Sequence, residues 1–179
     1  IAETVGRLPH RTTTAVADAE VALQALAAAP SQQPPALLRG AMRGLDFLIR
    51  GNQKLKTPDA LTKERLRAVA VLASDPSDVE LAAVRRDAWL AVLAATAADA
   101  SLVDEGLDDQ DAQVRRLAVA AVANVQVPDA TKRALLLRAL GDPSFNVRYS
   151  AVQAWSRTLQ PQDCGPLLRA AEDRSEEHT

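Results

Sequence analysis

The chain contains one pattern twice, and this internal repeat constrains its fold more than any other feature. The segment "DQDAQVRRLAVAAV" covers residues 109–122, and "DPSFNVRYSAVQAW" covers residues 142–155. In both, an aspartate precedes a Val-Arg pair by five residues, and an alanine follows the valine by four. Val114 falls on Val147 at an offset of 33 residues, and a weaker copy begins at Val84. A period of this length with two helical segments per unit indicates an α-solenoid.

The composition agrees with helices rather than strands. Apolar residues make up 47% of the chain but aromatic residues only 3%, so alanine, leucine and valine supply the core. No segment alternates apolar and polar residues between hairpin turns. We therefore predict an all-α protein, an α-solenoid of stacked antiparallel helix pairs. Within it, Asp142 followed by Pro143 reads as a helix cap with proline in the first turn.

The repeat signature also suggests where the chain divides. We predict an N-terminal helical region of degenerate repeats or a cap over residues 1–73, and repeats over residues 74–173. The last six residues, "RSEEHT" (174–179), correspond to the codons AGATCGGAAGAGCACACG, which begin a widely used sequencing adapter. We expect this tail to be non-native and the chain to be a fragment of a larger protein.

The repeated segments resemble the HEAT-repeat family, particularly its short bacterial form. The signature lies in "DDQDAQVRRLAVAAVANV" and "GDPSFNVRYSAVQAWSRT", with "DPSDVELAAVRRDAWLAVLAA" as a weaker copy. The resemblance implies a HEAT/armadillo-like superhelix. It also implies a structural ladder of hydrogen bonds and ion pairs between successive repeats, formed by Asp109 and Asp142 with Arg85, Arg115 and Arg148.

The residue types argue against a catalytic or metal-binding site in this chain. His10 and His178 are the histidines, and no histidine or cysteine has a second one at metal-ligand spacing. The sequence also has no His-Glu pair, which argues against the HEAT-like hydroxylases, because their iron sites need such pairs. Cys164 stands where a helix begins, and its interpretation as a small buried residue is preferred to a reactive one. We expect no catalytic residues, no metal and no cofactor.

A row of residues two positions after each repeated valine gives a candidate binding strip: Arg86, Arg116 and Tyr149. Gln113 and Asn146 lie close to this row. Arginine and tyrosine are enriched at binding hot spots, although an ordinary solvated face has the same composition. Trp89 and Trp155 stand at core spacing and are predicted to pack inside.

The favoured function is a non-catalytic scaffold for a protein or peptide partner. The alternative is an accessory array of a larger bacterial enzyme, a cyclophilin-type peptidyl-prolyl isomerase whose catalytic domain lies outside this stretch. The net charge of −2 and the absence of a basic tract argue against nucleic acid as a partner. The longest uncharged apolar runs are too short to span a membrane, so we expect a soluble protein, cytoplasmic or periplasmic.

Overall fold

A computed structural model describes residues 1–73, 75, 77–96, 99–159 and 164–172. Over these residues the chain is helical and contains no strand, which confirms the all-α prediction. No described helix is both long and apolar enough to cross a bilayer. The predicted non-native tail, with His178, lies outside the described residues.

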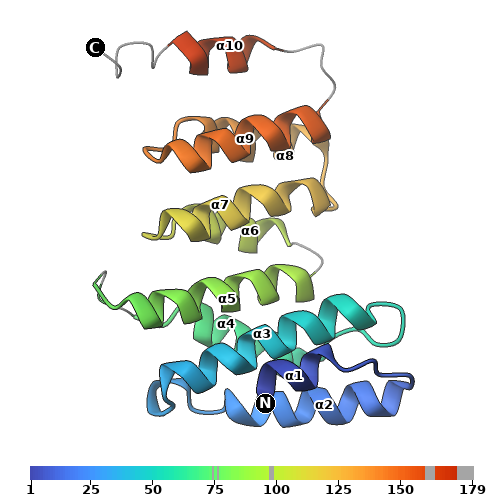
Figure 1. The fold of residues 1–179 in the computed structure, drawn as a ribbon. Helices are drawn as coiled ribbons and strands as arrows, with labels where there is room; N and C mark the ends of the chain where they lie inside the picture. The colour runs from blue at the N-terminus through green and yellow to red at the C-terminus, as the bar shows by residue number, and fades with distance from the viewer. Residues whose placement is uncertain (74, 76, 97–98, 160–163, 173–179) are drawn as a thin grey trace. The chain divides into compact units, whose positions relative to one another are not determined.

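The helices are α1 (Ala2–Arg7), α2 (Thr13–Leu26), η1 (Pro30–Gln32), α3 (Pro35–Asn52), α4 (Ala60–Ala70), α5 (Val79–Ala95), α6 (Ala100–Leu107), α7 (Ala112–Ala121), η2 (Val122–Asn124), α8 (Asp129–Leu140), α9 (Phe145–Thr158) and α10 (Gly165–Glu172) (Figure 1).

The chain divides into two compact units, Ile1–Ala97 and Ala98–Thr179. The first unit holds α1 to α5, and the second holds α6 to α10. The boundary predicted between residues 73 and 74 marks the start of the repeat signature, and residue 74 lies outside the described residues. That boundary separates α4 from α5, whereas these two helices pack on each other inside the first unit.

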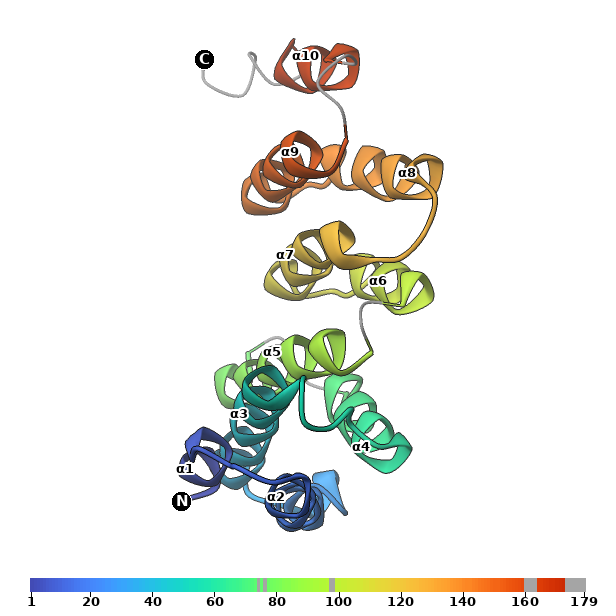
Figure 2. The ribbon, with the colours of Figure 1, turned by 90° about the vertical axis from the view of Figure 1, so that its right-hand side faces the viewer.

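The second unit shows the helix pairs that the repeat predicts. Helix α6 packs on α7, α8 packs on α9, and α7 packs on α9. Helices α6 and α8 form one layer and α7 and α9 the other, as seen within this unit in Figure 2. The first helices of the pairs therefore form one layer and the second helices form the other, which is the solenoid arrangement.

Small and β-branched residues at the repeated positions of α7 and α9 belong to the core. Val114 and Ala118 in α7 and their repeat equivalents Val147 and Ala151 in α9 are fully buried. Alanine at these positions lets the two backbones approach closely, and valine fills the remaining space. Trp155 is only 2% exposed, as its core spacing predicts.

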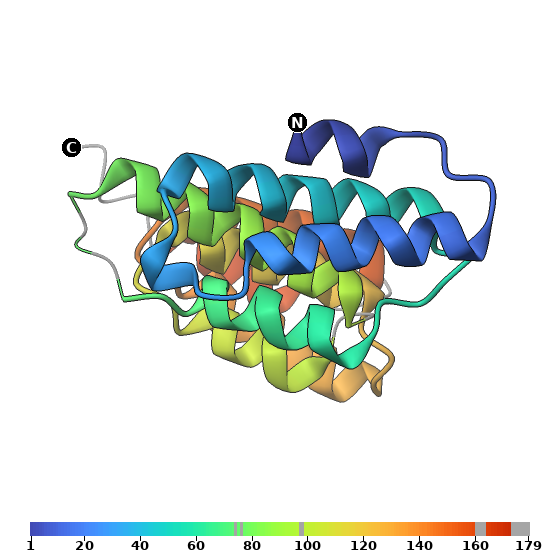
Figure 3. The ribbon, with the colours of Figure 1, turned by 90° about the horizontal axis from the view of Figure 1, so that it is seen from below.

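In the first unit, α3 is the central helix. Helices α1, α2 and α5 pack on it, and α4 packs on α5. Figure 3 shows α2 running beside α3. The contact between α1 and α3 is a backbone contact: a Cβ atom added to Gly6 would lie 1.9 Å from the Gly44 carbonyl oxygen. Glycine is therefore required at this crossing.

Aspartates begin several of the helices. The side chains of Asp59, Asp78 and Asp111 each accept a hydrogen bond from a backbone amide in the first turn. The predicted cap at Asp142 is wrong, because α9 begins two residues later, after Ser144. The Asp142 carboxylate instead bridges to the preceding repeat.

Candidate functional site

The repeat junction of the second unit is built around Arg115 and Asp142. Arg115, in the first turn of α7, donates from Nε to Asp142 Oδ2 at 2.7 Å and from Nη2 to Oδ1 at 3.0 Å. This two-pronged geometry matches the planar guanidinium to the carboxylate. The two side chains are only 13% and 9% exposed. The ion pair therefore joins one repeat to the next in a largely water-excluded place.

The protonation of this pair follows from its contacts. Burial by itself raises the pKa of the Asp142 carboxyl, but hydrogen bonds from Arg115 and from the Ser144 amide outweigh it, and the pKa lies below its usual value. The hydrogen bond with Asp142 raises the pKa of Arg115, against the opposing effect of burial. Both groups are therefore held in their charged forms.

A second set of bonds repeats with the same period. Arg115 Nη1 donates to the carbonyl oxygens of Asp109 at 2.9 Å and Gln110 at 3.1 Å. Arg148 Nη1 donates to the carbonyl oxygens of Asp142 and Pro143, each at 3.0 Å. Each arginine thus holds the turn that precedes its own helix.

The remaining members of the suggested ladder have other surroundings. Asp109 Oδ1 accepts a hydrogen bond from the Asp111 amide at 2.8 Å, inside its own turn. Arg85 belongs to the first unit, where it is buried and donates from Nε to the Ala70 carbonyl oxygen at 3.1 Å. Arg85 therefore joins α5 to the end of α4.

The predicted strip is distributed over both units. Arg86 lies half-buried on α5 in the first unit, and Arg116 and Tyr149 lie on the packed helices α7 and α9 of the second. Arg116 donates from Nε to Gln113 Oε1 at 3.0 Å, so the structure brings these two residues together. Tyr149 is 54% exposed.

An apolar stripe beside Tyr149 was missed by the sequence reasoning. Phe145 is 67% exposed and Val152 is 39% exposed, and with Tyr149 they follow the spacing of one helix face. The rings of Phe145 and Tyr149 stack with their centroids 6.1 Å apart, and the Arg148 guanidinium lies 5.9 Å from the Phe145 ring. The sequence pattern could have indicated this stripe, because the apolar residues of α9 fall on two faces of the helix and only one of these faces belongs to the core.

A buried polar cluster in the first unit was also missed. Glu20 is only 3% exposed on α2 and forms an ion pair with Lys56, while its Oε1 accepts from the Asp59 amide at 3.1 Å. Gln24 Nε2 donates to Asp59 Oδ1 at 2.9 Å, and Thr62 completes the cluster. Burial raises the pKa of Asp59, but bonds from Thr62 and Gln24 outweigh it and lower the pKa. These groups satisfy one another and join α2 to the start of α4.

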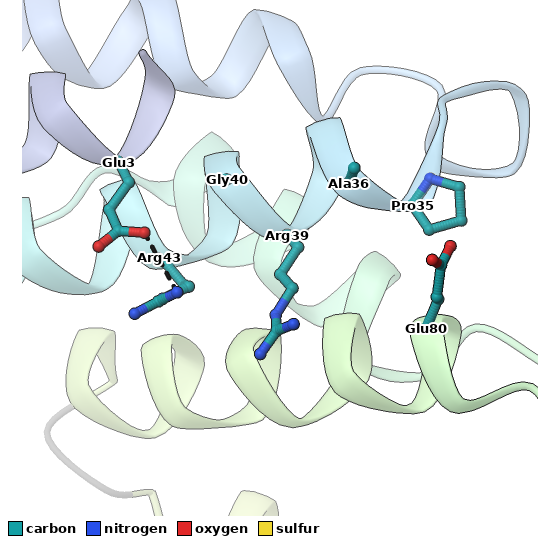
Figure 4. Close-up of a pocket in the computed structure, with 7 residues that line it drawn as sticks. All are labelled: Glu3, Pro35, Ala36, Arg39, Gly40, Arg43 and Glu80. Carbon is teal, nitrogen blue, oxygen red and sulfur yellow. Dashed lines mark ion pairs between the residues drawn. The ribbon is translucent and has the colours of Figure 1, made fainter.

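A shallow pocket of about 250 Å³ lies in the first unit among α1, α3 and α5 (Figure 4). Arg39 and Arg43 extend into it from α3. Arg43 pairs with Glu3 at 3.2 Å and Arg39 with Asp87 at 3.0 Å. Its volume is below the roughly 300–1,000 Å³ of ordinary small-molecule sites. Because carboxylates already engage both arginines, the pocket offers little charge to an anionic ligand.

Other candidate groups are placed as follows. In the described part of the chain, no three histidine, cysteine, aspartate or glutamate side chains are grouped to hold a metal ion. His10 Nε2 lies 3.0 Å from the Val5 carbonyl oxygen, and Cys164 is exposed rather than buried, contrary to its preferred interpretation. Trp89 is 1% exposed and packs inside the first unit.

Comparison with known proteins agrees with this geometry. The family model of HEAT repeats matches residues 100–178, which cover α6 to α10. No curated protein and no solved structure matches the chain. The paired helices and the repeat junction at Arg115 and Asp142 lie within the matched residues. Residues 100–178, the part of the chain from α6 onward, are therefore similar to HEAT repeats.

Proposed function

We propose that this chain is a non-catalytic HEAT-repeat scaffold that binds a protein or peptide partner through the second helices of its repeats. HEAT repeats are generally protein-interaction modules. The observation that carries the proposal is the exposed face of α7 and α9, where Arg116 lies on one helix and the stacked Phe145 and Tyr149 on the next. Exposed aromatic and arginine side chains on a rigid support are typical of binding hot spots.

The repeat junction supports this role by fixing the two helices. The Arg115–Asp142 bridge and the buried valine and alanine contacts make α7 and α9 one packed layer. A rigid layer loses little conformational entropy when a partner binds, which favours affinity.

Affinity capture with the intact chain tests the proposal. A variant with Arg86, Arg116 and Tyr149 all replaced by alanine is compared with a matched control in which Leu137 and Arg138 on α8 are replaced. We expect the first variant to lose the captured partner and the control to retain it. Equal capture by the two variants contradicts the proposal.

The alternative, an accessory array of a cyclophilin-type isomerase, stays a prediction. Sequencing the parent gene on both sides of this stretch tests it. A reading frame that continues into a cyclophilin domain supports it, and one that continues only into further repeats contradicts it.

A further inference from the structure

The charges on α7 and α9 are one-sided. Their sequences contain Arg115, Arg116, Arg148 and Arg157 and no aspartate or glutamate. The charge of Arg115 is neutralised by the bidentate pair with Asp142. This layer therefore carries an excess of positive charge although the whole chain has a net charge of −2.

Two of these arginines keep their charge available at the surface. Arg116 donates to the Gln113 amide oxygen at 3.0 Å, and Arg157 Nη2 donates to the Gln153 amide oxygen at 3.2 Å. Within the described residues, neither guanidinium has a carboxylate partner. An amide oxygen orients a guanidinium without cancelling its charge. Both side chains are thus positioned to receive an anionic group.

The contrast with the first unit is direct. There Arg39, Arg43 and Arg50 on α3 each form an ion pair with a carboxylate of the same unit. The arginines of α3 are thus neutralised inside their own unit, unlike Arg116 and Arg157.

Apolar surface lies beside this charge. Phe145, Tyr149 and Val152 form a stripe along α9, defined here as the aromatic stripe. Val152 can be compared with its repeat equivalent in α7: Val119 is fully buried, whereas Val152 is 39% exposed. At the other two positions, the apolar Phe145 and Tyr149 stand where α7 has Ala112 and Arg116, so the stripe is particular to α9.

We infer that the face formed by Arg116, Arg157 and the aromatic stripe binds an acidic peptide segment that carries apolar side chains. Carboxylates of the segment pair with the two guanidinium groups, and its apolar side chains cover Phe145, Tyr149 and Val152. The choice of occupant rests on charge complementarity and on the proposed function of this layer as a binding face.

Single-stranded nucleic acid is the competing occupant, because it also combines negative charge with groups that stack on aromatic rings. The charge of the chain disfavours it. Nucleic-acid binding without sequence preference depends on many lysine and arginine contacts to phosphates, and the whole chain has a net charge of −2.

Fluorescence anisotropy with three labelled probes tests the inference on the intact chain. The probes are a short glutamate peptide with leucine at every fourth position, the same peptide with lysine in place of glutamate, and an oligothymidylate of equal length. We expect only the glutamate peptide to bind, with an affinity that falls as salt is raised. Tighter binding of the oligothymidylate or the lysine peptide overturns the inference.

Variants locate the site. Arg116→Gln with Arg157→Gln, and separately Phe145→Ser with Tyr149→Ser, are each expected to weaken binding of the glutamate peptide about tenfold. The control pair Leu137→Ser with Arg138→Gln on α8 is expected to bind like the parent chain. Thermal unfolding followed by circular dichroism verifies that each variant is folded. Equal affinity of all three variants overturns the inference.

The two proposals fail separately. If the alanine variant of Arg86, Arg116 and Tyr149 loses its captured partner while the glutamate peptide does not bind the parent chain, the acidic partner is wrong and the scaffold function stands. If that variant captures its partner unchanged, the proposed function is wrong, whatever the peptide does.

Discussion

Replacing Arg115 with alanine is expected to weaken the second unit more than any change at an exposed charge. The substitution removes the two hydrogen bonds to the Asp142 carboxylate and those to the carbonyl oxygens of Asp109 and Gln110. It leaves Asp142 as an unpaired carboxylate whose side chain is only 9% exposed. A buried charge without its partner is far more costly than an exposed one.

The expected loss of stability lies between the values for an exposed ion pair and a fully buried one. An exposed ion pair contributes about 0.2–1 kcal/mol, and breaking a fully buried pair costs about 3–5 kcal/mol. Because both side chains are mostly but not completely buried, we expect Arg115→Ala to lower the free energy of unfolding by about 2–3 kcal/mol. Asp142→Ala has a similar cost, since it also removes the acceptor for the Ser144 amide.

Urea denaturation of the parent chain, the two single variants and the double variant forms a double-mutant cycle. We expect a coupling free energy of about 1.5–2 kcal/mol between Arg115 and Asp142. Arg115→Lys is expected to recover less than half of the loss, because an ammonium group cannot reproduce the two-pronged contact. A coupling below about 0.5 kcal/mol, the level of exposed pairs, refutes the reasoning.

Three further predictions concern stability. The folded-state pKa of Asp142 is lowered, so the contribution of its ionised carboxylate to stability is complete above the unfolded carboxyl pKa of about 4. That contribution is lost as the pH falls through the lower folded value. Urea midpoints between pH 6 and pH 3 are therefore expected to fall less steeply in Asp142→Asn than in the parent chain, and parallel curves contradict this. Gly6→Ala is expected to detach α1 from α3, because the added Cβ overlaps the Gly44 carbonyl. The Cβ of Gly51→Ala meets nothing within 4 Å, so this variant is expected to stabilise α3 by about 0.5–1 kcal/mol. Thermal unfolding compares the two variants, and equal melting temperatures contradict the prediction. Glu20→Ala leaves Lys56 without its buried partner and is expected to lower the free energy of unfolding by about 2–4 kcal/mol. Urea unfolding measures this loss, and an unchanged free energy of unfolding contradicts the prediction.

The sequence predicted those features that depend on local period. The offset of 33 residues places Val114 on Val147 and Ala118 on Ala151, and all four are fully buried. The same offset relates the turn contacts of Arg115 to those of Arg148. A repeat period can be read from one chain because each unit meets its neighbour in the same way.

Features that depend on contacts between distant residues were not predicted. Glu20 meets Lys56 and Thr62, which are 36 and 42 residues away and follow no repeat signature. Asp142 reads as a helix cap, yet its carboxylate accepts from an arginine 27 residues earlier, and α9 begins at Phe145, after Ser144. In each case, a tertiary partner decides what a polar side chain does.

Hydrogen exchange measured by mass spectrometry, on the chain alone and with its captured partner, tests the binding-face claim most directly. We predict that the partner slows exchange in peptides from α7 and α9, with smaller changes in α6 and α8. Protection confined to the first helices α6 and α8, with α7 and α9 unchanged, would contradict the assignment of the second-helix layer as the binding face.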